Sequence, residues 1–126
     1  MSLYTYLDSK DDLFDLMADA VAGEFPAPEP LPDDWREAIS RIARTIRELI
    51  TRRPWIVPLR ADGPRWSGPN GLRHVEQSLR ALAPLALPPQ RQGQVVTAID
   101  GYVLGYVTRR SIASHAAALD HACYRA

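Results

Sequence analysis

Gln90 to Asp120, QRQGQVVTAIDGYVLGYVTRRSIASHAAALD, belongs to the longest part of the chain without a proline, and its spacing predicts one long helix. At about 100° per residue, its apolar residues fall on two opposite faces. The first face holds Val96, Ile99, Val103, Tyr106 and Val107. The second face holds Ala98, Gly101, Gly105, Thr108, Ile112 and Ala116. A helix with two apolar faces is buried from two directions, so we expect a partner on each side.

The second face consists mainly of small residues, which allow a neighbouring backbone to come close. Gly101 and Gly105 are the clearest case, because a glycine inside a helix costs up to about 1 kcal/mol relative to alanine and therefore needs a packing reason. We predict that this face is the interface of a homodimer. Close packing within one monomer is the alternative.

Prolines divide the rest of the chain into shorter helical pieces, and neither strand patterns nor internal repeats are visible, so the fold class is all-α. The segment Phe25–Pro32 carries four prolines and is expected to be extended. We expect helices over residues 2–7, 10–22 (capped by Ser9), 34–53 (capped by Asp33 or Asp34), 55–61 and 70–83. Their apolar stripes are Leu13, Leu16, Met17, Ala20 and Val21; Trp35, Ile39, Ile42, Ile46, Leu49 and Ile50; and Leu72, Val75, Leu79 and Leu82.

The bulk composition excludes several classes of protein. At 126 residues the chain fits one domain, and no apolar run approaches the roughly 20 residues that cross a bilayer. Without an export signal, a cytoplasmic protein is expected. Cys123 is the single cysteine, which excludes an intrachain disulfide and a cysteine-cluster zinc site. The sequence lacks a Gly-rich phosphate loop, HExxH and Gly-x-Ser-x-Gly, so no enzyme is expected.

The opening string, SLYTYLDSKDDL from Ser2 to Leu13, resembles the end of the DNA-binding domain of TetR-type (tetracycline-repressor-like) regulators. There a recognition helix is followed by a two-residue turn and a lysine that opens the next helix. The resemblance implies DNA contacts by Ser2, Tyr4, Thr5, Tyr6 and Lys10. The alternative is that Leu3, Tyr4 and Leu7 only pack. Residues 1–24 carry one lysine against six carboxylates, and the first two helices of the motif are absent, so this chain alone is not expected to bind an operator.

Four further motifs resemble, in their order and spacing, the C-terminal region of such regulators in actinobacteria. They are Trp35-Arg36-Glu37, Arg53-Pro54-Trp55, Gly68-Pro69-Asn70 and Gly101-Tyr102-Val103-Leu104-Gly105. This resemblance implies a homodimer with a ligand cavity among the middle helices. We therefore divide the chain into the end of a helix-turn-helix domain with its connecting helix (1–24), a proline-rich linker (25–33) and an effector-binding and dimerisation domain (34–126).

Aromatic and aliphatic residues from position 55 onward could line the effector pocket, because ligand cavities in helical domains are mostly apolar. The candidates are Trp55, Leu59, Trp66, Val75, Leu79, Ile99, Tyr102, Val103 and Tyr106. Their alternative role is in the core. Tyrosine and tryptophan offer flat apolar area with a polar tip, which suits a small hydrophobic or aromatic effector. Asn70, His74 and Glu76 are the nearest polar candidates, and since His74 and Glu76 are two apart, at most one points inward. No metal or cofactor is assigned.

The sequence thus predicts the effector-binding and dimerisation part of a ligand-responsive TetR-family repressor. An effector would shift a two-state dimer toward one spacing of its DNA-reading heads, with the helix over residues 10–22 as the lever. Operator DNA would be a partner only of the full-length protein. The alternative is a stand-alone helical small-molecule carrier or dimerisation module without a DNA role.

Overall fold

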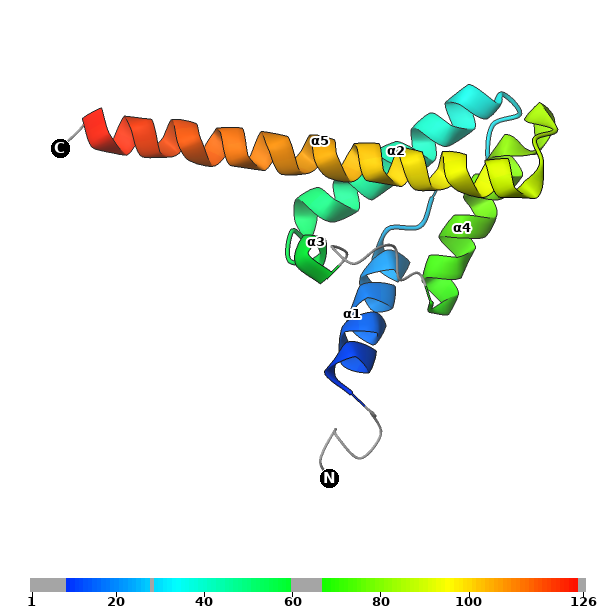
Figure 1. Cartoon of the computed structure of the whole chain (residues 1–126), viewed down its shortest axis with the longest axis horizontal. Helices are drawn as coiled ribbons and strands as arrows, with labels where there is room; N and C mark the ends of the chain where they lie inside the picture. Colours follow the sequence, from blue (N-terminus) through cyan, green and yellow to red (C-terminus); the bar gives the residue numbers. More distant parts are fainter. Residues whose placement is uncertain (1–8, 28, 60–66, 125–126) are drawn as a thin grey trace.

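All regular structure in the described part of the chain is helical. The computed structural model describes residues 9–27, 29–59 and 67–124 (Figure 1). Its elements are α1 (Lys10–Glu24), α2 (Trp35–Arg52), α3 (Ile56–Leu59), α4 (Pro69–Leu82), the 3-10 turn η2 (Ala83–Leu85) and α5 (Pro89–Tyr124). The predicted all-α fold is confirmed. The helix predicted over residues 2–7 lies outside the described residues.

The helix boundaries follow the capping residues that the sequence predicted. The Ser9 hydroxyl accepts a hydrogen bond from the Asp12 backbone N–H at 3.3 Å, and Asp34 Oδ1 accepts one from the Arg36 N–H at 3.2 Å. Asp34, not Asp33, is thus the cap of α2. Two helices begin one residue earlier than predicted, at Pro69 and Pro89, because proline is well suited to the first helical position, where its missing N–H has no helical partner.

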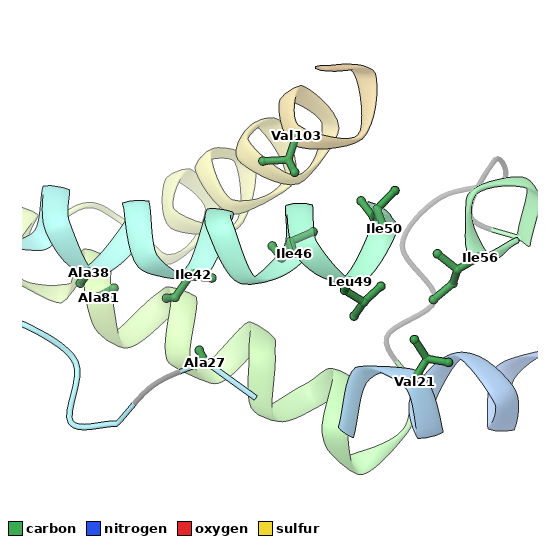
Figure 2. Close-up of a cluster of buried hydrophobic side chains, with 10 residues drawn as sticks. All are labelled: Val21, Ala27, Ala38, Ile42, Ile46, Leu49, Ile50, Ile56, Ala81 and Val103. Carbon is green, nitrogen blue, oxygen red and sulfur yellow. The ribbon is translucent and has the colours of Figure 1, made fainter. Parts of the chain in front are cut away.

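α2 lies at the centre of the molecule and supplies half of the buried core cluster, more than any other helix (Figure 2). The prediction of its apolar stripe is confirmed for the four residues that are buried, Ile42, Ile46, Leu49 and Ile50. Against them pack Val21 from α1, Ile56 from α3, Ala81 from α4 and Val103 from α5. α1, α3, α4 and α5 therefore all pack against the apolar stripe of α2.

The stripes predicted on α1 and α4 are covered less completely. On α1 only Val21 is buried, while Leu16 is 59% exposed. On α4 the buried apolar residues are Ala81 and Leu82, whereas Leu72 is 56% exposed. For α1 the reason is position, because it packs mainly on α4 below the core, so a narrow part of it faces a neighbour (Figure 1).

α5 crosses α2 and then extends past the other helices (Figure 1). Before the crossing ends, Val96, Asp100 and Val103 are buried, but every residue from 109 to 123 is exposed. The helix also runs further than the predicted end at Asp120. Across the described ranges, no helix combines the length and apolarity that a membrane span requires.

Candidate functional site

A groove with a volume of about 490 Å³ lies between α2 and α5. Residues on one side of each helix line it: Ala43, Arg44 and Arg47 of α2, and Val95, Ala98, Ile99, Tyr102, Val103 and Tyr106 of α5. We call it the α2–α5 groove. It forms because the helices cross on the buried stripe, so that the side chains next to the crossing diverge. Four of the predicted effector residues, Ile99, Tyr102, Val103 and Tyr106, meet here.

The other predicted effector residues lie elsewhere. Trp55 is 39% exposed beside α3, and Val75 and Leu79 are partly buried on α4; none of the three lines the groove. Leu59 is the last residue of α3, and Trp66 lies outside the described residues. Ala98, predicted for the dimer face, lines the groove instead of standing apart from it. The role of each of these residues stays a prediction.

A second hollow, of about 860 Å³, lies beside the groove, under the middle of α5. It shares Arg47 and Tyr106 with the groove, so the two spaces adjoin at these side chains. The rest of its lining comes from α2, α3 and the loop between them, and from the middle of α5: Ile50, Thr51, Pro54, Val57, Pro58, Val107, Thr108, Arg110, Ser111, Ile112 and Ser114. We call it the α3-side hollow.

Tyr106 and Arg110 form a polar pair where the two spaces adjoin. Arg110 Nη1 donates a hydrogen bond to Tyr106 Oη at 2.9 Å, and the guanidinium carbon lies 5.7 Å from the ring centroid. This hydrogen bond and the positive charge of Arg110, with a smaller contribution from Arg47, lower the pKa of Tyr106 below its ordinary value of 10.0. The same pairing raises the pKa of Arg110. The end of the groove at Tyr106 therefore carries positive charge from Arg47 and Arg110.

The predicted dimer face of α5, its outer face, is largely uncovered, but Ala98 also lines the groove, and Thr108 and Ile112 also line the α3-side hollow. Ala98, Gly101, Gly105, Ile112 and Ala116 are exposed, and Thr108 is half-buried. A Cβ built at Gly101 or Gly105 would meet no atom within 4 Å among the described residues. Close packing within the monomer, the alternative explanation of these glycines, is therefore not what the described part of the chain shows.

α1 is tied to the start of α4 by one carboxylate. Asp19 Oδ1 accepts a hydrogen bond from the Gly71 N–H at 2.8 Å, and Asn70 Nδ2 donates to Asp19 Oδ2 at 3.1 Å and to the Asp19 carbonyl at 3.2 Å. A Cβ at Gly68 would overlap Asp19 Cγ, and one at Gly23 would lie 2.8 Å from Asn70 Nδ2. Asn70, a polar candidate for the pocket, thus joins two helices.

The remaining polar candidates lie away from the groove. His74 is partly buried and its Nε2 lies 3.5 Å from Asp100 Oδ1, so this pair links α4 to α5. Glu76 is exposed and pairs with Arg80, which fits the expectation that at most one of His74 and Glu76 points inward. Among the described residues, no group of His, Cys, Asp or Glu is suited to hold a metal ion. Lys10 is exposed at the start of α1, and Ser2, Tyr4, Thr5 and Tyr6 lie outside the described residues.

Sequence reasoning missed the α2 side of the groove, which consists of Ala43, Arg44 and Arg47. A signal for it was present. Arg44 and Arg47 lie one turn apart beside the apolar stripe. Glu48 is four residues from both Arg44 and Arg52, and it pairs with Arg52 because a glutamate that precedes its basic partner on a helix forms the better ion pair. Arg47 has no carboxylate one turn away on α2, and the one near Arg44 pairs with another arginine, so both are candidates for a ligand-facing side.

Residues 27–122 match the family described as the tetracyclin repressor-like, C-terminal domain. The chain belongs to this family. The match begins within the predicted linker, and it covers every helix from α2 to α5. The resemblance found in the four C-terminal motifs is thereby confirmed.

Two curated relatives of this tetracycline-repressor-like chain are named as transcriptional regulators. It is 35% identical over 106 residues to the HTH-type transcriptional repressor DrrR1 of Streptomyces coeruleorubidus, covering 83% of this chain and 39% of that protein. It is 32% identical over 114 residues to an HTH-type transcriptional regulator of Saccharopolyspora erythraea, covering 90% of this chain and 48% of that protein. The chain therefore spans less than half the length of these relatives.

Solved structures agree with the family assignment. The TetR family protein ActR of Streptomyces coelicolor, in complex with actinorhodin, superposes with a TM-score of 0.74 at 25% identity, over 86% of this chain and 52% of ActR. ActR without ligand and ActR in complex with (S)-DNPA give the same TM-score. The helical arrangement of Figure 1 is thus shared with 52% of the ActR chain.

Proposed function

We propose that this chain is the effector-binding and dimerisation part of a ligand-responsive transcriptional repressor that acts in the cytoplasm. The observation that carries the proposal is the α2–α5 groove, an apolar site in a chain of the tetracycline-repressor-like family. The relatives support it, since one is named a transcriptional repressor and ActR is solved with actinorhodin. Operator binding is proposed only for the full-length protein.

The groove suits a small aromatic ligand. Ile99 and Val103 give it an aliphatic floor, while Tyr102 and Tyr106 offer ring faces with a hydroxyl at the tip. Tyr102 is 75% exposed, so its ring is free to close over a bound molecule. A groove volume of about 490 Å³ falls within the range of about 300–1,000 Å³ that is typical for ligand sites.

A neutral aromatic dye tests this site. N-phenyl-1-naphthylamine, which fluoresces in apolar surroundings, should bind the chain, and Val95→Trp should weaken binding about fivefold or more by filling the groove. Ala113→Trp is the matched control, because Ala113 is exposed on the same helix and lines neither the groove nor the α3-side hollow. Equal loss in the two variants, or no binding at all, would contradict the proposed effector site.

We further propose that the outer face of α5 is the homodimer interface. Its support is the pair of glycines in open space, since each destabilises a helix and neither gains a close contact among the described residues of the monomer. Light scattering over a concentration series should find a dimer that the double variant Gly101→Leu, Gly105→Leu loses. A dimer of undiminished affinity in that variant would place the interface elsewhere.

α1 is the proposed lever between effector and DNA. The hydrogen bonds of Asp19 to Asn70 and Gly71 support this role, because they connect the start of α4 to α1, so that a shift of one helix would reach the other.

Deletion of the gene tests the repressor function. It should raise the transcripts of the operons that the protein represses, as measured by RNA sequencing. Unchanged transcript levels would favour the carrier without a DNA role over the repressor.

A further inference from the structure

The α2–α5 groove and the α3-side hollow are lined by three arginines. No carboxylate among the described residues lines either space. Arg44 and Arg47 line the groove, and Arg47 also lines the hollow, together with Arg110. The rest of both linings is uncharged. An apolar site of this kind repels cations and attracts anions, since charges of one sign add along low-dielectric walls.

Several arginines outside these two spaces pair with nearby carboxylates, although Arg36, Arg73, Arg91 and Arg109 have none within 4.0 Å among the described residues. Arg41 lies 2.7 Å from Glu37, Arg52 lies 2.8 Å from Glu48, and Arg80 lies 2.9 Å from Glu76. By contrast, no carboxylate of the described part of the chain lies within 4.0 Å of Arg44, Arg47 or Arg110. The three arginines of the groove and the hollow therefore add positive charge that no ion pair offsets within the described residues.

Tyr106 marks the point where this charge converges. Its hydroxyl accepts the 2.9 Å hydrogen bond from Arg110 and also lies in the field of Arg47. The lowered pKa of Tyr106 reports that a negative charge is favoured at this end of the groove. The surroundings that favour a phenolate would equally favour the carboxylate, sulfonate or phenolate of a ligand.

We propose that the α2–α5 groove takes an aromatic ligand that carries an acidic group. The inference rests on the proposed effector site and names its ligand class. The rings lie against Ile99, Tyr102 and Val103, and the anion is held at the Tyr106 end by Arg47 and Arg110. Arg44, one turn before Arg47 on α2, adds positive charge along the groove wall. A neutral aromatic ligand would gain the ring contacts but not the ionic ones.

Two dyes with the same ring system separate the two contributions. 1-Anilinonaphthalene-8-sulfonate is anionic, and N-phenyl-1-naphthylamine is its neutral counterpart without the sulfonate. Raising the salt concentration should weaken binding of the anionic dye and leave the neutral dye nearly unchanged, because salt screens exposed charges. Fluorescence titration of the whole chain gives both affinities.

A charge-matched pair of variants locates the anion. Arg47→Gln with Arg110→Gln should weaken the anionic dye about fivefold or more and the neutral dye less than about twofold. The control, Arg41→Gln with Arg80→Gln, removes the same charge from arginines that lie outside both spaces and pair with glutamates. It should change neither affinity by more than about twofold.

Each other result has a distinct meaning. Equal losses of the two dyes in the Arg47, Arg110 variant, or a salt effect on neither, would overturn the anion preference and leave the effector site standing. Failure of both dyes to bind the unaltered chain would overturn the effector site itself. If the dye is released as the chain dimerises, a second copy of the chain occupies the groove. That result would overturn both the effector site and its anion preference.

Discussion

Compared along its length, α5 changes from a buried to an exposed helix at about Arg109. Up to Thr108 its inward side packs on α2, and Val96 and Val103 are both 7% exposed. Beyond that point Ile112 is 64% and Leu119 67% exposed, although both are as apolar as the valines. The difference shows that burial here is set by the crossing with α2, whereas helix formation is set by the alanine-rich sequence itself.

The comparison predicts very different costs for similar truncations. Ile46→Ala, under the crossing, should lower the free energy of unfolding by about 2–5 kcal/mol, because it leaves a cavity in a closed core. Ile112→Ala, beyond the crossing, should change it by less than about 0.5 kcal/mol. Urea unfolding at a concentration where light scattering reports a monomer measures both. Comparable losses would mean that the far half of α5 folds back on the core.

A second contrast concerns two aspartates of α1. Asp19→Ala should lower the free energy of unfolding by about 1–2 kcal/mol, since it removes the acceptor of the Asn70 and Gly71 hydrogen bonds. Asp15→Ala is the control, because Asp15 accepts no side-chain hydrogen bond within the described residues. If both variants unfold at the same urea concentration, the hydrogen bonds between α1 and α4 do not contribute to the free energy of unfolding.

Glycines on α5 extend the comparison to smaller effects of opposite sign. Gly101→Ala and Gly93→Ala should each stabilise the monomer by about 0.5–1 kcal/mol, because both positions are helical and open. The two variants should differ in the dimer, where Gly101 lies on the proposed interface and Gly93 does not. Sedimentation velocity should therefore find weaker pairing for Gly101→Ala alone. Equal pairing of the two variants would remove Gly101 from the interface.

Local rules let the sequence predict the helices and the central stripe. Ser9 and Asp34 cap helices as expected, and Ile42 and Ile46 are buried, because capping and helical periodicity depend on residues within one or two turns. The sequence did not reveal that Leu16 would be exposed. That outcome depends on how few helices surround α1, which is a property of the whole arrangement.

The site was predictable on one helix and not on the other. Periodicity placed Ile99, Val103 and Tyr106 on one face of α5, and Tyr102 was added to the candidates for its aromatic ring. Their partners Arg44 and Arg47 come from α2, and which side of α2 faces α5 depends on the crossing of the two helices. The same limit applies to Asp19 and Asn70, which are distant in sequence and meet only where α1 packs on α4.

The smallest effect that sharpens the comparison belongs to Tyr106 and Arg110, which stand on either side of the change at Arg109. Arg110→Gln removes the hydrogen bond and the charge that lower the pKa of Tyr106, so the pKa should rise toward its ordinary value of 10.0. Titration of the phenolate absorbance, with Tyr106→Phe to identify the signal and Arg52→Gln as the charge control, follows this shift.

A lowered pKa in the folded chain stabilises the phenolate form of the fold. The resulting stability is fully present only above the ordinary pKa of tyrosine and is lost as the pH falls through the lowered value, so at neutral pH the pair adds nothing by this route. The unfolding free energy of the Arg110→Gln variant should therefore equal that of the unaltered chain at neutral pH and fall below it in alkali. If the phenolate titrates identically in both chains, Arg110 does not hold its charge over Tyr106 in solution, and the far half of α5 contributes nothing to the groove.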